Sequence, residues 1–265
     1  MKKLDGQTAI VTGAGSGIGK AISKKLSLEG AYVWATDVQE DGGKKTVQEI
    51  HESGGKAEFL QLDVRDADQV ISTLDHIYKS SGRIDILINN AGISGNPAPV
   101  DLMGNEDWKD LLDIHVNGSF YCLKAAAKYM KMHNYGRIIN MSSLASETSL
   151  QGFAHYAAAK YALLGLTETS AKDLASYNIT VNALKPGIIR STLTGGILEV
   201  AEERIAASTP LGKVGSPGDV AEAACFLASP DSSFLTGISI IVDGGFRLVT
   251  EMDKVMNEMI AASSN

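Results

Sequence analysis

Short apolar, β-branched runs alternate along the chain with longer stretches whose apolar residues recur at helical spacing. We expect strands at Ala9–Val11, Tyr32–Ala35, Ala57–Leu62, Ile84–Ile88, Arg137–Met141, Thr180–Leu184 and Ile238–Val242. Strands of nearly continuous apolar character, each followed by a helix, are typical of a parallel sheet covered on both faces. Right-handed crossovers then predict an α/β fold with a doubly wound parallel sheet, which binds ligands at the carboxyl ends of its strands.

The chain shows no internal boundary. No linker rich in Pro, Gly or Ser divides the 265 residues, so we expect a single domain over residues 1–246. Behind it, an apolar stripe at helical spacing predicts a C-terminal helical extension over residues 247–265. The stripe consists of Leu248, Met252, Val255, Met256, Met259 and Ile260. Two interpretations stay open: this helix packs on its own subunit, or it crosses to a neighbouring one.

Charge and composition exclude several classes of protein. The net charge of −7 carries no basic block, which argues against nucleic acid or an anionic membrane as the main partner. Two cysteines, Cys122 and Cys225, cannot make a disulfide scaffold, and the five histidines show no metal-ligand spacing. We therefore expect no metal site. Because the opening MKKLDGQTAIV has no apolar segment typical of a signal peptide, we expect a cytoplasmic protein.

A glycine-rich turn follows the first expected strand and opens a helix. It reads Thr12-Gly13-Ala14-Gly15-Ser16-Gly17-Ile18-Gly19. A bound phosphate needs close backbone approach and free N–H groups at a helix N-terminus, and side chains obstruct both. The order of strand, turn and helix therefore favours a dinucleotide phosphate site over an ordinary glycine-rich turn.

Asp37 ends the second expected strand, at about the spacing of an acid that binds an adenosine ribose. A carboxylate there accepts hydrogen bonds from the ribose and repels a 2′-phosphate. Ser16 and Val38 stand where an Arg or Lys would attract that phosphate. The sequence therefore predicts NAD(H) rather than NADP(H), with a solvated loop carboxylate as the alternative reading of Asp37.

Three side chains are suited to proton transfer. Tyr156 and Lys160 are four residues apart and share one face of a helix. A nearby ammonium favours the phenolate of a tyrosine, whose ordinary pKa of about 10 is too high for proton transfer at neutral pH. Such a pair also occurs by chance, but Ser143 follows the strand Arg137–Met141 at the edge where the sheet places its ligand.

Together these residues resemble the short-chain dehydrogenase/reductase family, in its single-domain branch with TGxxxGxG and YxxxK motifs. The resemblance runs from about Gln7 to Gly245. Its motifs are Thr12–Gly19, Asp37, Asp63-Val64, Asn89-Asn90-Ala91-Gly92, Asn117, Ser143, Tyr156, Lys160 and Pro186-Gly187. It implies a Rossmann-like fold, a nicotinamide cofactor and an enzyme that acts on a CH–OH group.

The resemblance implies a role for each of four catalytic residues. Tyr156 would be the acid/base, and Ser143 would hydrogen-bond the reacting oxygen. Lys160 would lower the pKa of Tyr156 and hold the nicotinamide ribose. Asn117 would anchor a water molecule in a proton relay.

The resemblance also implies a cofactor-binding set. Its members are Gly13, Ser16, Gly17, Ile18, Asp37, Asp63, Val64, Asn90, Gly92, Tyr156, Lys160, Pro186, Gly187, Ile189 and Ser191. Asp63 and Val64 would contact the adenine, and Ile189 would meet the nicotinamide carboxamide. The family commonly has Thr where this chain has Ser191, with Thr192 next, so the hydroxyl that meets the carboxamide stays open between the two. Arg190 has no role assigned.

Three functions remain in view. The leading hypothesis is an NAD(H)-dependent oxidoreductase that interconverts a secondary alcohol and a ketone of the polyol, sugar, cyclic or steroid type. The first alternative is a 3-oxoacyl-acyl-carrier-protein reductase, but such enzymes dock an acidic carrier through basic side chains, and the matching positions here are Asn134 and Lys172. The second is a catalytically silent NAD(H)-binding sensor, which the intact catalytic set disfavours.

The same resemblance implies a small-molecule substrate and an oligomer of identical subunits. The substrate pocket should be lined by Ser94–Val100, Leu144–Phe153 and a mobile lid at Ser191–Ala207. Two long helical segments, about Asp113–Lys131 and Phe153–Ser176, have Ala-rich faces that permit close approach. A homodimer or homotetramer is therefore expected.

Overall fold

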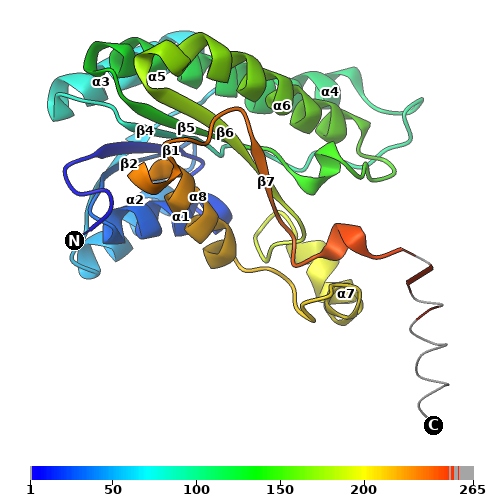
Figure 1. The fold of residues 1–265 in the computed structure, drawn as a ribbon. Helices are drawn as coiled ribbons and strands as arrows, with labels where there is room; N and C mark the ends of the chain where they lie inside the picture. The colour runs from blue at the N-terminus through cyan, green and yellow to red at the C-terminus, as the bar shows by residue number, and fades with distance from the viewer. Residues whose placement is uncertain (1, 251, 254–255, 257–265) are drawn as a thin grey trace.

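The computed structural model describes residues 2–250, 252–253 and 256, and a parallel sheet runs through its centre (Figure 1). The strands are β1 (Thr8–Thr12), β2 (Tyr32–Asp37), β3 (Lys56–Gln61), β4 (Ile86–Asn89), β5 (Gly136–Met141), β6 (Ile179–Pro186) and β7 (Ser239–Val242). Their order is β3-β2-β1-β4-β5-β6-β7, and all neighbours pair in parallel. The predicted doubly wound sheet is thus confirmed, and each strand ends within two residues of its expected limits.

Helices cover both faces of the sheet (Figure 1). One layer contains α1 (Gly17–Leu28), α2 (Glu40–Glu52) and α8 (Pro217–Ala228). The other contains α3 (Ala67–Ser81), α4 (Asn105–Leu112), α5 (Gly118–His133) and α6 (Ala154–Leu174). The short helix α7 (Gly195–Ala207) follows β6 and lies beyond both layers.

The strands are apolar on both sides because two separate cores pack against them. Along β1 and β2, Val11 and Val33 are buried in the core under α1 and α8. Their neighbours Ile10 and Trp34 are buried in the core on the opposite face, under α3 and α5. Successive strand residues point to opposite faces of the sheet. Because both faces are covered here, the strand sequences are apolar throughout and do not alternate between polar and apolar residues.

A π-helical turn interrupts the helix that the sequence predicted to begin at Asp113. The turn η1 (Asp113–Asn117) joins α4 to α5, so this part of the chain has an i→i+5 bonding pattern between two α-helices. The wider turn changes which side chains face the sheet. His115 is buried beneath it and Asn117 is exposed.

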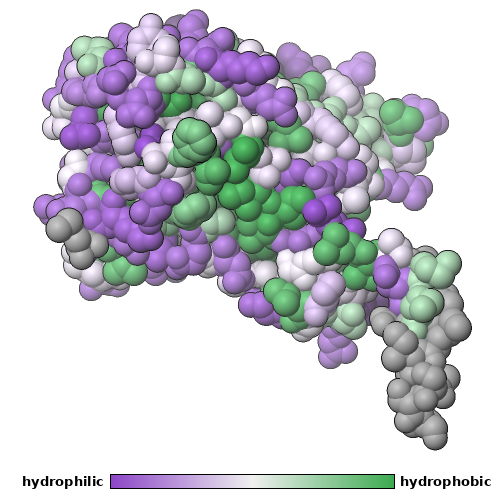
Figure 2. Space-filling view, viewed as in Figure 1, coloured by the Kyte–Doolittle hydropathy of each residue, from purple (hydrophilic) through white to green (hydrophobic). Residues whose placement is uncertain are grey.

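The sheet is least covered at its β7 edge. Ile240, Ile241 and Val242 are only half-buried, and Phe226 at the end of α8 is 39% exposed. Figure 2 shows apolar surface gathered along this edge. Within the described residues, no helix has the length and apolar character needed to cross a membrane. The predicted C-terminal helix over residues 247–265 lies largely outside the described residues, and Phe246–Leu248 forms one 3-10 turn.

Candidate active site

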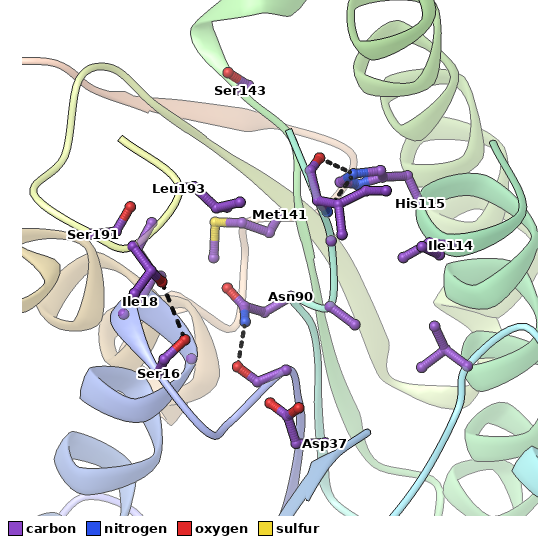
Figure 3. A pocket seen from close by; sticks show the side chains of 18 of the residues that line it. Ser16, Ile18, Asp37, Asn90, Ile114, His115, Met141, Ser143, Ser191 and Leu193 are labelled. Atoms are coloured by element: carbon purple, nitrogen blue, oxygen red, sulfur yellow. Dashed lines mark hydrogen bonds between the residues drawn. The ribbon is translucent and has the colours of Figure 1, made fainter. Parts of the chain in front are cut away.

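A cavity of about 460 Å³ opens at the carboxyl ends of the strands, where β1 and β4 lie side by side and the order in which successive strands are added to the sheet reverses. Such switch points are where doubly wound sheets bind ligands. The cavity is lined by every expected site residue except Asn117: Gly13, Ser16, Gly17, Ile18, Asp37, Asp63, Val64, Asn90, Gly92, Ser143, Tyr156, Lys160, Pro186, Gly187, Ile189 and Ser191. In Figure 3, Asp37 lies at one end and Ser143 at the other.

In the glycine-rich turn, backbone atoms lie so close together that two of the glycines could not carry a side chain. Gly13 has φ +64°, and a Cβ added there would lie 2.9 Å from Cα of Ala91. A Cβ at Gly19 would lie 2.1 Å from the Gly13 carbonyl oxygen. Asn90 holds the turn in place, because its Nδ2 donates to the carbonyl oxygens of Thr12 and Gly13 at 2.9 and 3.1 Å.

The carboxylate of Asp37 is oriented by two backbone amides. Gly15 N donates to Oδ2 at 2.8 Å, and Gln39 N donates to Oδ1 at 2.8 Å. These bonds fix the carboxylate between the end of β2 and the glycine-rich turn. A fixed, negatively charged acceptor in this position fits the hydroxyls of a ribose and disfavours a phosphate.

At the same end of the cavity, Asp63 and Arg65 form an ion pair. Arg65 Nη2 donates to Asp63 Oδ2 at 2.7 Å, and Arg65 Nε lies 3.0 Å from both oxygens. This contact lowers the pKa of Asp63 and raises that of Arg65. The guanidinium is therefore already paired with a carboxylate, which reduces its attraction for a further anion.

The two serines after β5 have different environments. Ser142 is 2% exposed, and its hydroxyl donates to the Lys160 carbonyl oxygen at 2.8 Å, so it fastens β5 to α6. Both serines line the cavity, but Ser143 is less buried, and its hydroxyl accepts from Ala145 N at 3.1 Å. Of the two, Ser143 is the residue that can reach a ligand.

Tyr156 and Lys160 lie on the same face of α6, as predicted. Burial raises the pKa of Tyr156, and a hydrogen bond with the Ser143 side chain lowers it in part. Burial also lowers the pKa of Lys160 to about 7. Lys160 Nζ donates to the Met141 carbonyl oxygen at 2.8 Å and lies 5.3 Å from the centroid of the Tyr156 ring. In this arrangement the ammonium is bonded to the end of β5 and lies beside the ring of the phenol.

The structure turns Asn117 away from the cavity. Its side chain is exposed, and its Nδ2 donates to Asp113 Oδ1 at 2.6 Å within the same turn. His115, two residues earlier, lines the cavity instead. The sequence contained a signal for this, because His115 follows Leu111 at helical spacing, and both are buried.

The segment after β6 forms a further wall of the cavity. Ser191 Oγ lies 3.2 Å from Thr194 Oγ1, whereas Thr192 Oγ1 lies 3.4 Å from Ser16 Oγ across the groove. The sequence pointed to Ser191 or Thr192 for a hydroxyl here, and Thr194 was not anticipated although it lines the same cavity. All three hydroxyls lie along the wall that would face the carboxamide.

Arg190, which had no role assigned, forms an exposed ion pair with α7. Its Nη1 and Nη2 donate to the two carboxylate oxygens of Glu202 at 2.7 and 2.6 Å. The guanidinium side chain is 59% exposed and that of Glu202 is 39% exposed. This pair joins the segment after β6 to the helix that was expected to form a lid.

The cavity has the features that a dinucleotide requires. It is elongated between Asp37 and Ser143, its glycines permit close backbone approach, and α1 begins at Gly17 with its N-terminal amides toward the groove. Among the described residues, no group of three or more His, Cys, Asp or Glu side chains could hold a metal ion. The donor set therefore fits an NAD(P)-type ligand.

Comparisons with known proteins agree with this geometry. A family model described as enoyl-(acyl carrier protein) reductase matches residues 13–247. The chain is 38% identical over 243 residues to 3-oxoacyl-(acyl-carrier-protein) reductase FabG of Thermotoga maritima, covering 92% of this chain and 98% of that protein.

Two solved structures share the fold and bind different nicotinamide cofactors. A gluconate 5-dehydrogenase from Burkholderia cenocepacia, in complex with NADP and tartrate, has a TM-score of 0.89 and 34% identity over 94% of this chain and 98% of that one. NAD⁺-bound xylitol dehydrogenase has a TM-score of 0.87 and 35% identity over 92% of this chain and 100% of that one.

Proposed function

Because the chain belongs to the short-chain dehydrogenase/reductase family, we propose that this oxidoreductase uses NAD(H) to interconvert a secondary alcohol and a ketone. The observation that carries this proposal is the single cavity that holds Asp37 at one end and Ser143, Tyr156 and Lys160 at the other. A dinucleotide that spans this distance would place its reactive ring beside the groups that handle the proton.

The preference for NAD(H) rests on Asp37. Its carboxylate is held by Gly15 N and Gln39 N, so it cannot turn away easily from a 2′-phosphate. Val38, the next residue, offers no positive charge. The nearest guanidinium along this wall, that of Arg65, is paired with Asp63. The relatives bind either cofactor, so this preference is argued from the chain's own residues.

In the proposed chemistry, the nicotinamide would exchange hydride with the substrate carbon when bound. Tyr156 would accept the hydroxyl proton in oxidation and return it in reduction, while Ser143 would hydrogen-bond the same oxygen. Lys160 has a pKa near neutrality because it is buried, so it can be protonated or neutral in the working range of pH. As the ammonium, it would favour the phenolate and hold the ribose.

The substrate end combines apolar and polar side chains. Leu193 lines the cavity and is about half exposed. The segments expected to bind the substrate also carry half-exposed Leu150 and Ile197 and exposed Ser149 and Gln151. This surface suits a neutral polyol, sugar, cyclic ketone or steroid. A pocket of this kind discriminates weakly between such shapes, so we propose the reaction class without one substrate.

A 3-oxoacyl-acyl-carrier-protein reductase is the second candidate, favoured by the similarity to the Thermotoga maritima enzyme. Two residues argue against this candidate. Asp37 disfavours NADPH, and Asn134 stands where one of the two basic side chains that bind an acidic carrier is expected. Asn134 is the C-cap of α5 and has a left-handed conformation with φ 50°. Asparagine favours this conformation, so the residue also has a structural role in ending the helix.

The test is NADH formation from NAD⁺ with a panel of secondary alcohols, repeated with NADP⁺ and, in reverse, with a 3-oxoacyl thioester and NADPH. We expect turnover with NAD⁺ on one alcohol class. Tyr156→Phe should lower kcat by about 10³-fold while the Kd for NADH stays within about twofold, because the phenol handles the proton and does little to bind the cofactor.

Other outcomes would reject the proposal. Near-normal turnover of Tyr156→Phe would remove the assignment of the acid/base. Preferential reduction of the thioester with NADPH would favour the second candidate. Tight NADH binding without turnover of any substrate would favour a sensor.

A further inference from the structure

His115 is a buried imidazole packed against the ring of Tyr156. Its side chain is 2% exposed, the two ring centroids are 5.7 Å apart, and the ring planes meet at 85°. An edge-to-face contact of this kind is a favourable arrangement of two aromatic rings and restrains both. The proposed acid/base is therefore supported by a ring outside the expected catalytic set.

The same imidazole also holds the backbone of Ile93 (Figure 3). His115 Nε2 lies 2.8 Å from the Ile93 carbonyl oxygen and 3.1 Å from its amide nitrogen. Either neutral tautomer thus forms one hydrogen bond to this residue: Nε2–H donates to the carbonyl, or Nε2 accepts from the amide. Ile93 belongs to the segment after β4 that lines the cofactor part of the cavity.

Gly92 provides the space that the imidazole fills. A Cβ added at Gly92 would lie 2.2 Å from Cε1 of His115, far closer than two carbon atoms can approach. The ring and the glycine are complementary in shape, so the wall of the cofactor groove and η1 are fitted to each other at this point.

The charge state of His115 limits what it can do. Burial is the main cause that holds its pKa well below the ordinary value of 6.5, and the nearby Lys160 and His155 act in the same direction. The hydrogen bond to Ile93 opposes them. His115 is therefore uncharged at neutral pH and does not supply a proton as an imidazolium.

We propose that His115 is a positioning residue, which sets the place of Tyr156 relative to the cofactor wall by holding the tyrosine ring and the Ile93 backbone together. This proposal rests on the proposed function, because it concerns the acid/base assigned there. It gives a role to His115, whereas the sequence pointed to Asn117. A displacement of about 1 Å between reacting groups can cost about 10²-fold in rate, so loss of His115 should lower kcat more than it raises KM.

Three substitutions separate the two contacts. His115→Phe keeps a ring against Tyr156 and loses the bond to Ile93, His115→Gln keeps a polar group for Ile93 and loses the ring, and His115→Ala loses both. We expect kcat to fall by about 10²-fold in His115→Ala and by about 10-fold or less in the other two. KM and the Kd for NADH should change by less than about threefold in all three.

His51→Ala is the matched control. His51 Nε2 lies 2.9 Å from the Ala57 carbonyl oxygen, so this variant loses the same kind of bond at a place outside the cavity. It reports the effect of removing one imidazole–backbone bond on folding alone, and its kcat should match that of the wild type.

A second readout needs neither cofactor nor substrate. The tyrosinate absorbance of Tyr156 is obtained as the difference between each protein and the same protein carrying Tyr156→Phe, which isolates one of the eight tyrosines. Because burial raises the pKa of Tyr156, exposing its ring to water in His115→Ala should move this titration to lower pH. His115→Phe, which keeps the ring covered, should titrate as the wild type does.

The outcomes are distinguishable. A wild-type kcat in His115→Ala, or a greater loss in Asn117→Ala than in His115→Ala, would overturn the positioning role. Equal losses in all three His115 variants would show damage to the fold instead and would also reject it. If the wild type oxidises no alcohol, the proposed function fails, and an unchanged Tyr156 titration in His115→Ala would still reject this inference separately.

Discussion

At the scale of single residues, the cofactor preference depends on how firmly one carboxylate is held. Asp37 accepts one backbone amide on each oxygen, from Gly15 and from Gln39. A Cβ added at Gly15 would lie 2.9 Å from Asp37 Oδ2, so the turn and the acid are in close contact. A flexible surface acid could swing away from a phosphate, whereas this one stays in place.

Asp37→Ala should therefore relax the choice of cofactor. We expect the ratio of kcat/KM for NAD⁺ to that for NADP⁺ to fall by at least about 10-fold, since a charged hydrogen bond is lost together with the repulsion of a 2′-phosphate. Asp37→Asn is the companion variant, because it keeps an acceptor and removes the charge. An unchanged ratio in both variants would show that Asp37 does not select the cofactor.

Which of His115 and Asn117 faces the cavity was not predicted correctly from the sequence. Tyr156 and Lys160 could be placed on one face from helical spacing, whereas Ser143 was predicted from its place after β5 together with the family resemblance. Asn117 could not be placed in this way, since the π-helical turn η1 widens the helix just before it. One changed turn rotates the following side chain to the outer face, and the sequence signals only the burial of His115, through its spacing from Leu111.

At the scale of elements, the strands were the most predictable parts, since doubly buried strands are short, apolar and bounded by turn residues. The segment from Ser191 to Ala207 was predicted as a lid by its place after β6. Its attachment through Arg190 and Glu202 was not predicted, because an ion pair between a loop residue and a helix residue 12 positions later has no sequence period. This exposed pair holds α7 near the substrate end.

Glu202→Gln should loosen α7 with little effect on the fold. We expect KM for the substrate to rise about threefold at nearly constant kcat, and Tm to change by less than about 2 °C, because exposed ion pairs contribute little to stability. The exchanged pair Arg190→Glu with Glu202→Arg should restore KM. Glu40→Gln, which removes an exposed pair with Lys44 in α2, is the control, and an equal rise in KM there would reject the role of α7.

At the scale of the whole molecule, Lys160 links the site to global stability. Burial lowers its pKa from 10.5 to about 7. Between these values the unfolded chain binds a proton that the folded chain does not, so the contribution of Lys160 makes the fold more stable as pH rises through this window. Below it, the folded protein carries a buried charge at full cost.

Lys160→Met should show this cost directly. We expect the variant to be more stable than the wild type at about pH 7, and the difference in unfolding free energy to narrow by about 2 kcal/mol by about pH 9. Denaturant titrations at the two pH values measure it. Lys172→Met, on the exposed face of the same helix, should show no such narrowing, and a constant difference for Lys160→Met would contradict the assignment.

The assembly is a second property of the whole molecule. The outer faces of α5 and α6 carry half-exposed Phe120 and Tyr161 beside small residues, which suits the predicted homodimer or homotetramer. Gly165 lies on this face of α6, and a Cβ added there meets nothing within 4 Å. Gly165→Arg should therefore leave the subunit intact and split the oligomer, as measured by light scattering. An unchanged mass would show that α6 is not the interface.

The order of the strands also dictates a direction in which the site is assembled while the chain is being synthesised. The first four strands, in the order β3-β2-β1-β4, carry the residues from Gly13 to Gly92 that line the Asp37 end of the groove. Strands β5, β6 and β7 then join one after another at a single growing edge and bring Ser143, Tyr156 and the segment after β6 with them. A nascent chain that emerges from its N-terminus therefore contains every residue of this end before Ser143 and Tyr156 have been synthesised.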